Sequence, residues 1–194
     1  MGSGMDRADI KTLHVLIVGG RPHAVTTLRT IFGIIGLTKV SAVVDSVRAI
    51  DCLREERIDV VFCDEHADHV NGIPFPKAAR RAPGVPNPML PIFLVFSSPI
   101  RPQIERARDD GITDVVVRPV SAATIIRKLR AATLCPRPFI VAGSFFGPDR
   151  RGDSRLLFRG EERRERWPKK IKIAPHETAS LLAAPTTTEA VQVE

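Results

Sequence analysis

The sequence predicts an α/β protein built on a five-stranded, doubly wound parallel sheet, and two observations support this fold class. Short apolar runs recur five times along residues 13–135, and the run Ile58–Asp64 contains four consecutive apolar residues, as in strands that helices cover on both faces. Segments with apolar residues at helical spacing lie between these runs, so strands and helices alternate. A sheet of this kind carries ligands and chemistry at the carboxyl ends of its strands.

Each strand is expected where an apolar run ends in a turn or a polar residue. The expected strands are Leu13–Val18, Val40–Val44, Ile58–Asp64, Pro91–Phe96 and Asp114–Val117. Asp64 ends the third strand, Ser97 follows the fourth and Arg118 follows the fifth. These three residues are therefore expected at the functional edge of the sheet.

Apolar stripes and capping residues predict the helices. The inward face of the first helix consists of Val25, Leu28, Phe32 and Ile35. Gly36 is expected to end this helix, since glycine is common just past a helix end. Asp45 or Ser46 begins the second helix and Ser121 begins the last, because their side-chain oxygens can accept backbone N–H groups.

Two further helices are expected between the third strand and the fifth. The segment 72–90 is rich in Gly and Pro, so only a short helix around Lys77–Arg81 fits there. A helix over Pro102–Asp110 has proline in its first turn and Gly111 just after its end.

The positive charge of the chain is concentrated late in the sequence. The formal net charge is +7, and residues 136–172 alone contribute +6, from 11 basic and 5 acidic side chains. We therefore divide the chain into a leader at 1–12, whose start resembles a tag remnant, a domain over 13–135, a basic extension over 136–172 and a tail over 173–194. The extension and the tail are expected to be irregular and partly disordered, and the tail to be mobile.

The cysteines and the lack of long apolar segments point to the cytoplasm. The three cysteines lack the spacing of a metal site, and Cys63 lies in a run expected to be buried. No stretch approaches the roughly 18 apolar residues of a membrane helix, and the amino terminus lacks the apolar core of a signal peptide. We therefore expect a cytoplasmic protein without membrane contact.

Over residues 13–135 this pattern resembles the receiver domain of bacterial two-component response regulators, the CheY-like family. The resemblance rests on Asp64, the serine pair after the fourth strand and Arg118-Pro119, with Asn71-Gly72 and Gly111 also in register. It implies the flavodoxin-like receiver fold, phosphorelay signal transduction and Asp64 as the phosphoacceptor position. It also implies a protein partner, such as a histidine kinase, a phosphotransfer protein or a downstream regulator. The oligomeric state stays open, a homodimer included.

Among the positions that carry the chemistry of this family, only Asp64 is unchanged. The family has an acidic pair after the first strand, and here Gly19 and Gly20 stand in its place. The basic residue after the fifth strand is Arg118 where the family has lysine. The switch positions of the family fall on Phe96, with Ser97 beside it, and on Val115.

Loss of the acidic pair predicts weak or absent Mg²⁺ binding, because Mg²⁺ needs hard oxygen ligands in near-octahedral geometry. No other cofactor is expected. Asp64 and Arg118 are then expected to form an ion pair at the sheet edge. The alternative is a substitute metal site made of Glu65, His66, Asp68 and His69. Restoring the pair with Gly19→Asp and Gly20→Asp is expected to raise Mg²⁺ affinity.

The basic extension repeats a motif of glycine, acid and two arginines. Gly147-Pro148-Asp149-Arg150-Arg151 is echoed thirteen residues later by Gly160-Glu161-Glu162-Arg163-Arg164. The first copy resembles the Phe-Gly-Pro-Asp-Arg-Arg tail that follows receiver domains in some alphaproteobacterial proteins. One interpretation is a solvated, disordered segment, and the other is a linear segment that docks a partner. The partner-docking candidates are Phe146, Arg150, Arg151, Phe158, Arg163, Arg164 and Trp167.

Three functions follow from these observations. The first is an atypical receiver, or pseudo-receiver, that is not an enzyme and acts mainly by protein–protein interaction. The second is a receiver that still accepts a phosphoryl group at Asp64. The third is nucleic-acid binding through residues 137–172, which is not favoured because the segment has no helix-turn-helix pattern and no aromatic-interleaved strands.

Overall fold

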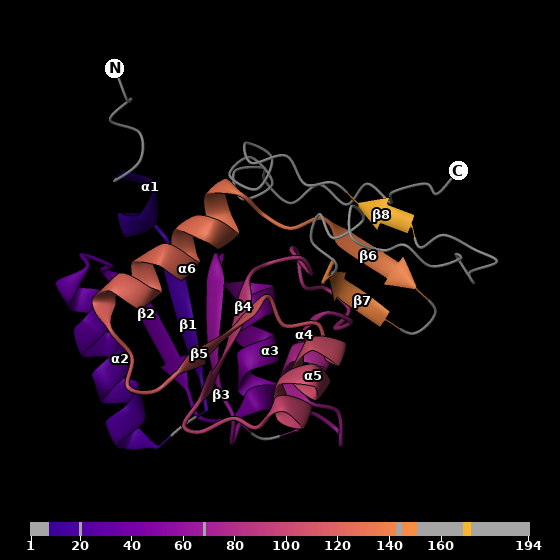
Figure 1. The fold of residues 1–194 in the computed structure, drawn as a ribbon, viewed down its shortest axis with the longest axis horizontal. Coiled ribbons are helices and arrows are strands. Elements are labelled where there is room, and N and C mark those ends of the chain that lie inside the picture. Colours follow the sequence, from indigo (N-terminus) through magenta and orange to yellow (C-terminus); the bar gives the residue numbers. More distant parts are fainter. Residues whose placement is uncertain (1–7, 20, 68, 143–144, 151–168, 172–194) are drawn as a thin grey trace.

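A parallel five-stranded sheet in the order β2-β1-β3-β4-β5 forms the centre of the protein (Figure 1). The computed structural model describes residues 8–19, 21–67, 69–142, 145–150 and 169–171. The strands are β1 (His14–Val18), β2 (Lys39–Val43), β3 (Val60–Asp64), β4 (Ile92–Phe96) and β5 (Asp114–Val117). All neighbouring strands pair in parallel, which confirms the predicted doubly wound sheet. Every residue of the central β3 is buried.

Helices cover both faces of this sheet. They are α1 (Ala8–Lys11), α2 (Pro22–Ile34), α3 (Ser46–Glu55), α4 (Phe75–Ala79), α5 (Arg101–Asp109) and α6 (Ala122–Leu134). One core cluster joins the sheet to α2 and α6, and a second joins its other face to α3, α4 and α5. The longest helices have 13 residues, and none in the described ranges is long and apolar enough to cross a bilayer.

Capping residues set the helix starts that the sequence predicted. Asp45 Oδ1 accepts the Val47 N–H at 2.7 Å before α3, and Ser121 Oγ accepts the Thr124 N–H at 3.2 Å before α6. The short helix α4 begins two residues earlier than expected, at Phe75. Prolines on both sides of Phe75 explain the shift, because proline is already preorganised for the first turn of a helix.

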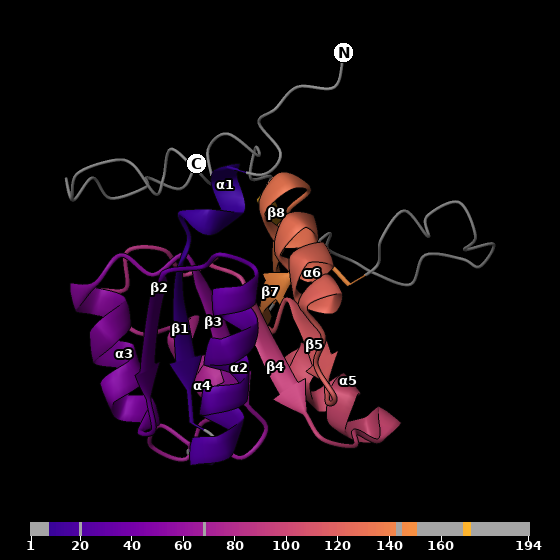
Figure 2. The same cartoon turned by 90° about the vertical axis from the view of Figure 1, so that its left-hand side faces the viewer.

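The leader contributes to the fold ahead of the expected domain start at residue 13. Helix α1 places Ile10 in the core cluster of α2 and α6, where its side chain is 7% exposed. Figure 2 shows α1 beside the end of α6. The folded domain therefore begins before the first strand, because Ile10 shields apolar surface at this end of the sheet.

Within the described residues, part of the basic extension forms a small antiparallel sheet. Its strands are β6 (Phe139–Ala142), β7 (Phe145–Pro148) and β8 (Lys169–Ile171), in the order β7-β6-β8. We call β6 and β7 together the hairpin. Two aromatic rings on its paired strands pack together: the Phe139 and Phe146 rings lie 5.5 Å apart, and Phe139 is 4% exposed.

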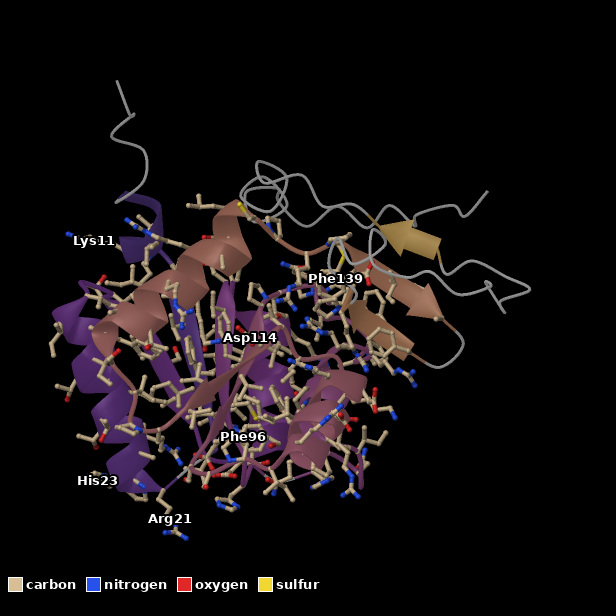
Figure 3. The ribbon with its side chains drawn as sticks, in the orientation of Figure 1. Lys11, Arg21, His23, Phe96, Asp114 and Phe139 are labelled. Carbon is tan, nitrogen blue, oxygen red and sulfur yellow. The ribbon has the colours of Figure 1, made fainter. Side chains whose placement is uncertain are left out.

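Two glycines let the hairpin lie directly on the turn after α5. Gly111 has a φ of +87°, and a Cβ there would lie 2.8 Å from the backbone oxygen of Phe146. A Cβ on Gly147 would lie 2.8 Å from the Cα of Gly111. Any side chain at either position would therefore separate the two backbones. Figure 3 shows Phe139 at the end of the sheet opposite Arg21, which follows β1.

A buried arginine of the main domain packs against the hairpin. Arg80 is 3% exposed, and its guanidinium donates to the backbone oxygens of Gly111 (3.1 Å), Pro88 (2.7 Å) and Leu90 (2.5 Å). The same group lies 5.0 Å from the centre of the Phe139 ring. Burial lowers the pKa of Arg80, since desolvation disfavours its charged form.

A second arginine ties the end of the hairpin to α5. Arg150 forms an ion pair with Asp109 and donates to the backbone oxygen of Arg108 at 2.5 Å. Its guanidinium also lies 4.5 Å from the centre of the Phe145 ring. A cation at the carboxyl end of a helix satisfies free carbonyl groups and opposes the negative end of the helix dipole. The hairpin therefore stabilises the end of α5.

Candidate functional site

Asp64 lies where the sequence placed it, at the carboxyl end of β3 between β1 and β4. Its side chain is 7% exposed, so the carboxylate is almost removed from water. A carboxylate this buried needs partners for both oxygens. Both oxygens of Asp64 have such partners.

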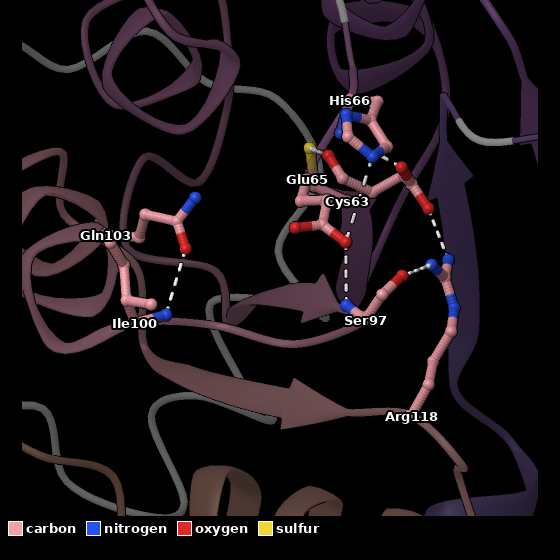
Figure 4. A network of polar contacts seen from close by, with 8 residues as sticks. Cys63, Glu65, His66, Ser97, Ile100, Gln103 and Arg118 are labelled. Carbon is pink, nitrogen blue, oxygen red and sulfur yellow. Dashed lines mark hydrogen bonds and ion pairs between the residues drawn. The ribbon is translucent and has the colours of Figure 1, made fainter.

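Arg118 and the backbone amide of His66 each bind one oxygen of Asp64 (Figure 4). Arg118 Nη2 forms an ion pair with Asp64 Oδ2, and the His66 N–H donates to Oδ1 at 2.9 Å. Arg118 Nη1 also donates to Ser97 Oγ at 2.9 Å. The predicted ion pair is thus present, and the planar guanidinium joins the ends of β3, β4 and β5 in one network.

Glu65 completes this network, and the sequence gave it a role only as a metal ligand. Its Oε1 accepts the backbone N–H of Ser97 at 2.6 Å, and its side chain is 12% exposed. Glu65 thereby holds the start of the loop between β4 and α5. The sequence signal for this role was the position of Glu65 directly after a buried strand. An acid at such a position is half-buried and needs a hydrogen-bond donor.

The predicted switch positions have different surroundings. Phe96 is 4% exposed and packs in the core cluster under α5, so it cannot act as a mobile polar switch. Ser97 accepts from Arg118 through its hydroxyl and donates to Glu65 through its backbone. Val115 is half-buried against the same cluster as Phe96. Of the three residues, only Ser97 enters the polar network.

The space on the Gly19 side of Asp64 is narrow. Gly19 has a φ of +68°, and a Cβ there would lie 2.8 Å from the Cβ of Ala67. In the described part of the chain, the space that Gly19, Val25, Leu28 and Arg118 enclose beside Asp64 is too small for a water molecule. Mg²⁺ keeps several waters at near-octahedral positions, so this small space does not fit a hydrated ion.

The substitute metal site is not assembled from the residues that the structure describes. Across the described ranges, no three His, Cys, Asp or Glu side chains gather in a metal-binding arrangement. Glu65 is committed to Ser97, and the ring of His66 is exposed. Asp68 lies outside the described residues, as does Gly20 of the replaced acidic pair.

Rebuilding the acidic pair is expected to damage the fold, which revises the expectation of a gain in Mg²⁺ affinity. Gly19→Asp should lower the free energy of unfolding by about 2–4 kcal/mol, since it forces a side chain against Ala67 in the left-handed region. Gly33→Ala is the matched control, because no atom lies within 4 Å of its Cβ position. It should stabilise α2 by about 0.5–1 kcal/mol. Equal unfolding midpoints for Gly19→Asp and the wild type would contradict this prediction.

Two of the predicted docking residues contact the chain itself. Phe146 packs against Phe139, and Arg150 pairs with Asp109. Their contacts inside the molecule account for the first copy of the repeated motif. The remaining docking candidates lie outside the described residues, and they are Arg151, Phe158, Arg163, Arg164 and Trp167.

Comparison with known proteins agrees with this arrangement. The response regulator receiver domain family model matches residues 15–130. CheY4, a chemotaxis response regulator of Vibrio cholerae, is 20% identical over 61% of this chain and 96% of that chain, with a TM-score of 0.52. The receiver domain of the sensor histidine kinase PA1611 from Pseudomonas aeruginosa PAO1, which has magnesium in its active-site cleft, is 19% identical over 61% and 94%, with a TM-score of 0.53. These likenesses concern the fold. No curated protein sequence matches the chain significantly.

Proposed function

Because this chain belongs to the response regulator receiver domain family, we propose that it is an atypical receiver that signals mainly by protein–protein contact. Receiver domains act in two-component signalling, where they interact with proteins such as kinases or effectors. In this proposal the chain is a cytoplasmic adaptor and not an enzyme. Phosphorylation that depends on Mg²⁺ is weak or lost.

One observation carries the proposal: both oxygens of Asp64 are already bound by groups of the protein. Phosphoryl transfer to a carboxylate depends on positioning and on cations that neutralise the charge of the phosphoryl group, and partners on both oxygens make the carboxylate a weaker nucleophile. At this site Arg118 neutralises Asp64 itself, and Gly19 supplies no carboxylate for a metal. The phosphoacceptor position is therefore held in an ion pair.

Glu65 supports a fixed conformation of the same region. Its carboxylate holds the Ser97 N–H, and Arg118 holds the Ser97 hydroxyl. The loop that leads into α5 is thus anchored by two charge-assisted hydrogen bonds without any phosphoryl group. A partner that binds this surface would therefore find the same loop conformation without phosphorylation.

Incubation with acetyl phosphate and Mg²⁺, followed by intact-mass measurement, tests the proposal. We expect no phosphoryl adduct on the wild-type chain, because Arg118 and His66 occupy the oxygens of Asp64. A typical receiver labelled under the same conditions is the positive control. A stable adduct that Asp64→Asn abolishes would instead support the phosphoacceptor function.

Partner capture from the native host tests the adaptor role directly. The full chain and its Asp64→Asn variant are expected to capture the same protein, since the proposed contact does not need phosphorylation. Comparison with a chain that ends at Cys135 would show whether the extension takes part. Loss of capture in Asp64→Asn, with its fold intact, would contradict a role independent of this carboxylate.

A further inference from the structure

A groove of about 350 Å³ runs between α4 and α5, beside the core cluster of α3, α4 and α5. Its volume falls within the range of about 300–1,000 Å³ found for small-molecule sites. The floor is apolar and consists of Phe75, Leu94, Phe96 and Ala107. Its polar groups are Gln103, Arg106 and Asp110 on α5, and Asp64, Glu65, His66 and His69 at and after the end of β3.

Arg106 and Asp110 are separated although they lie one turn apart on the same face. Opposite charges at this spacing usually pair, and Arg101 and Glu105 on the same helix do so at 2.8 Å. Within the described residues, neither Arg106 nor Asp110 has an ion pair or a side-chain hydrogen bond. Counting only the residues that the structure describes, the α5 wall of the groove therefore carries one cation and one anion without an ion-pair partner.

The position of Asp110 is unfavourable for the fold, which suggests that it serves another purpose. It lies at the carboxyl end of α5, where the helix dipole disfavours negative charge, and next to a second acid, Asp109. Arg150 forms an ion pair with Asp109 and not with Asp110. Burial raises the pKa of Asp110, and the charges of Lys77, His69 and Arg150 only partly oppose this effect.

Asp110→Asn is expected to stabilise the protein at neutral pH and not at acid pH. Because the pKa is raised in the folded state, the destabilising charge appears as the pH rises through that pKa and is fully present at pH 7. We expect a melting temperature about 1–2 °C higher for the variant at pH 7, and no difference below about pH 3.5. Thermal melts against pH measure this. A lower melting temperature at pH 7 would contradict the prediction.

From this arrangement we propose that the groove binds an apolar α-amino acid as its zwitterion. The ammonium group would lie on the Asp110 carboxylate and the carboxylate on the Arg106 guanidinium. Both contacts are charge-assisted hydrogen bonds, and the guanidinium fork matches a carboxylate. The apolar side chain would cover the rings of Phe75 and Phe96 on the floor.

The neighbouring polar groups fit such a ligand. The Gln103 Oε1 accepts the Ile100 N–H at 3.0 Å, and Figure 4 shows the amide nitrogen of Gln103 on the side away from Ile100. That nitrogen can donate to a ligand carboxylate. A ligand with only one charge would leave Arg106 or Asp110 unpaired. The proposed site goes beyond the signalling role, since it provides an input that does not depend on phosphorylation of Asp64.

Isothermal titration calorimetry on the full chain tests the site with four probes. L-Leucine and L-phenylalanine carry both charges, isoamylamine lacks the carboxylate, and 4-methylpentanoate lacks the ammonium group. We expect saturable binding of at least one amino acid. Each single-charge analogue should bind at least about tenfold more weakly, as the loss of one charged contact implies. Equal binding of either analogue, or no saturable binding of both amino acids, would overturn the proposal.

Paired variants on α5 separate the site from the rest of the helix. Asp110→Asn and Arg106→Gln should each weaken amino-acid binding at least about tenfold. Glu105→Gln and Arg108→Gln are matched controls outside the groove, and they should change the affinity less than about twofold. A shift of the Gln103 side-chain amide signal on titration of the wild type gives a readout without any variant. Unchanged affinity in both groove variants, or an unmoved Gln103 signal at saturation, would contradict the proposed amino-acid site. This result does not depend on partner capture, so the amino-acid site and the adaptor role can fail separately.

Discussion

Replacing Arg80 by methionine is expected to lower the free energy of unfolding by about 3–5 kcal/mol. Methionine fills a similar volume but provides no donor for the backbone oxygens of Pro88, Leu90 and Gly111. Buried carbonyl groups without donors keep their desolvation cost, which outweighs the relief of removing a buried cation. The Phe139 ring also loses the cation over its face. Urea unfolding followed by circular dichroism measures the loss.

Arg48→Met is the matched control for this substitution. Arg48 lies on α3 with an exposed side chain, and within the described residues it makes no side-chain hydrogen bond or ion pair. Its replacement should change stability by less than about 0.5 kcal/mol. If Arg80→Met and Arg48→Met unfold at the same urea concentration, Arg80 does not support the hairpin as we describe.

Arg118→Ala is expected to destabilise the protein by about 2–4 kcal/mol at pH 7. The substitution leaves the Asp64 carboxylate, which is 7% exposed, without its cation. We place the loss below that of a fully buried pair because Arg118 is 28% exposed, so water can reach the site. Thermal melts of the variant and the wild type at pH 7 measure this loss.

A double substitution separates the charge effect from the loss of packing. Asp64→Asn in the Arg118→Ala background should recover most of the lost stability, because no buried charge remains. Asp64→Asn alone should cost only about 1 kcal/mol, since Arg118 can turn toward water. Equal stability of Arg118→Ala and the double variant would show that Asp64 does not depend on Arg118 for neutralisation.

Local patterns along the chain were sufficient to predict the sheet and the position of its main acidic residue. Continuous apolar runs indicated the five parallel strands, and Asp64 and Arg118 were expected together because the carboxyl ends of parallel strands share one edge. The capping role of Ser121 followed from hydrogen-bonding chemistry within one turn of helix. The strands and the cap depend on residues a few positions apart, whereas the Asp64–Arg118 pair, 54 positions apart, followed from the parallel arrangement of the strands.

The contacts that most affect function join residues far apart in the chain, so local patterns could not reveal them. Glu65 reaches Ser97, Gly19 meets Ala67, and Arg80 supports the hairpin at Phe139. Each requires a particular approach of two backbones, and hydrophobic periodicity carries no information about that approach. The small space that Gly19 lines beside Asp64, and the groove with its two separated charges, exist only after the chain has packed. Packing determines them because burial and desolvation depend on all neighbouring segments at once.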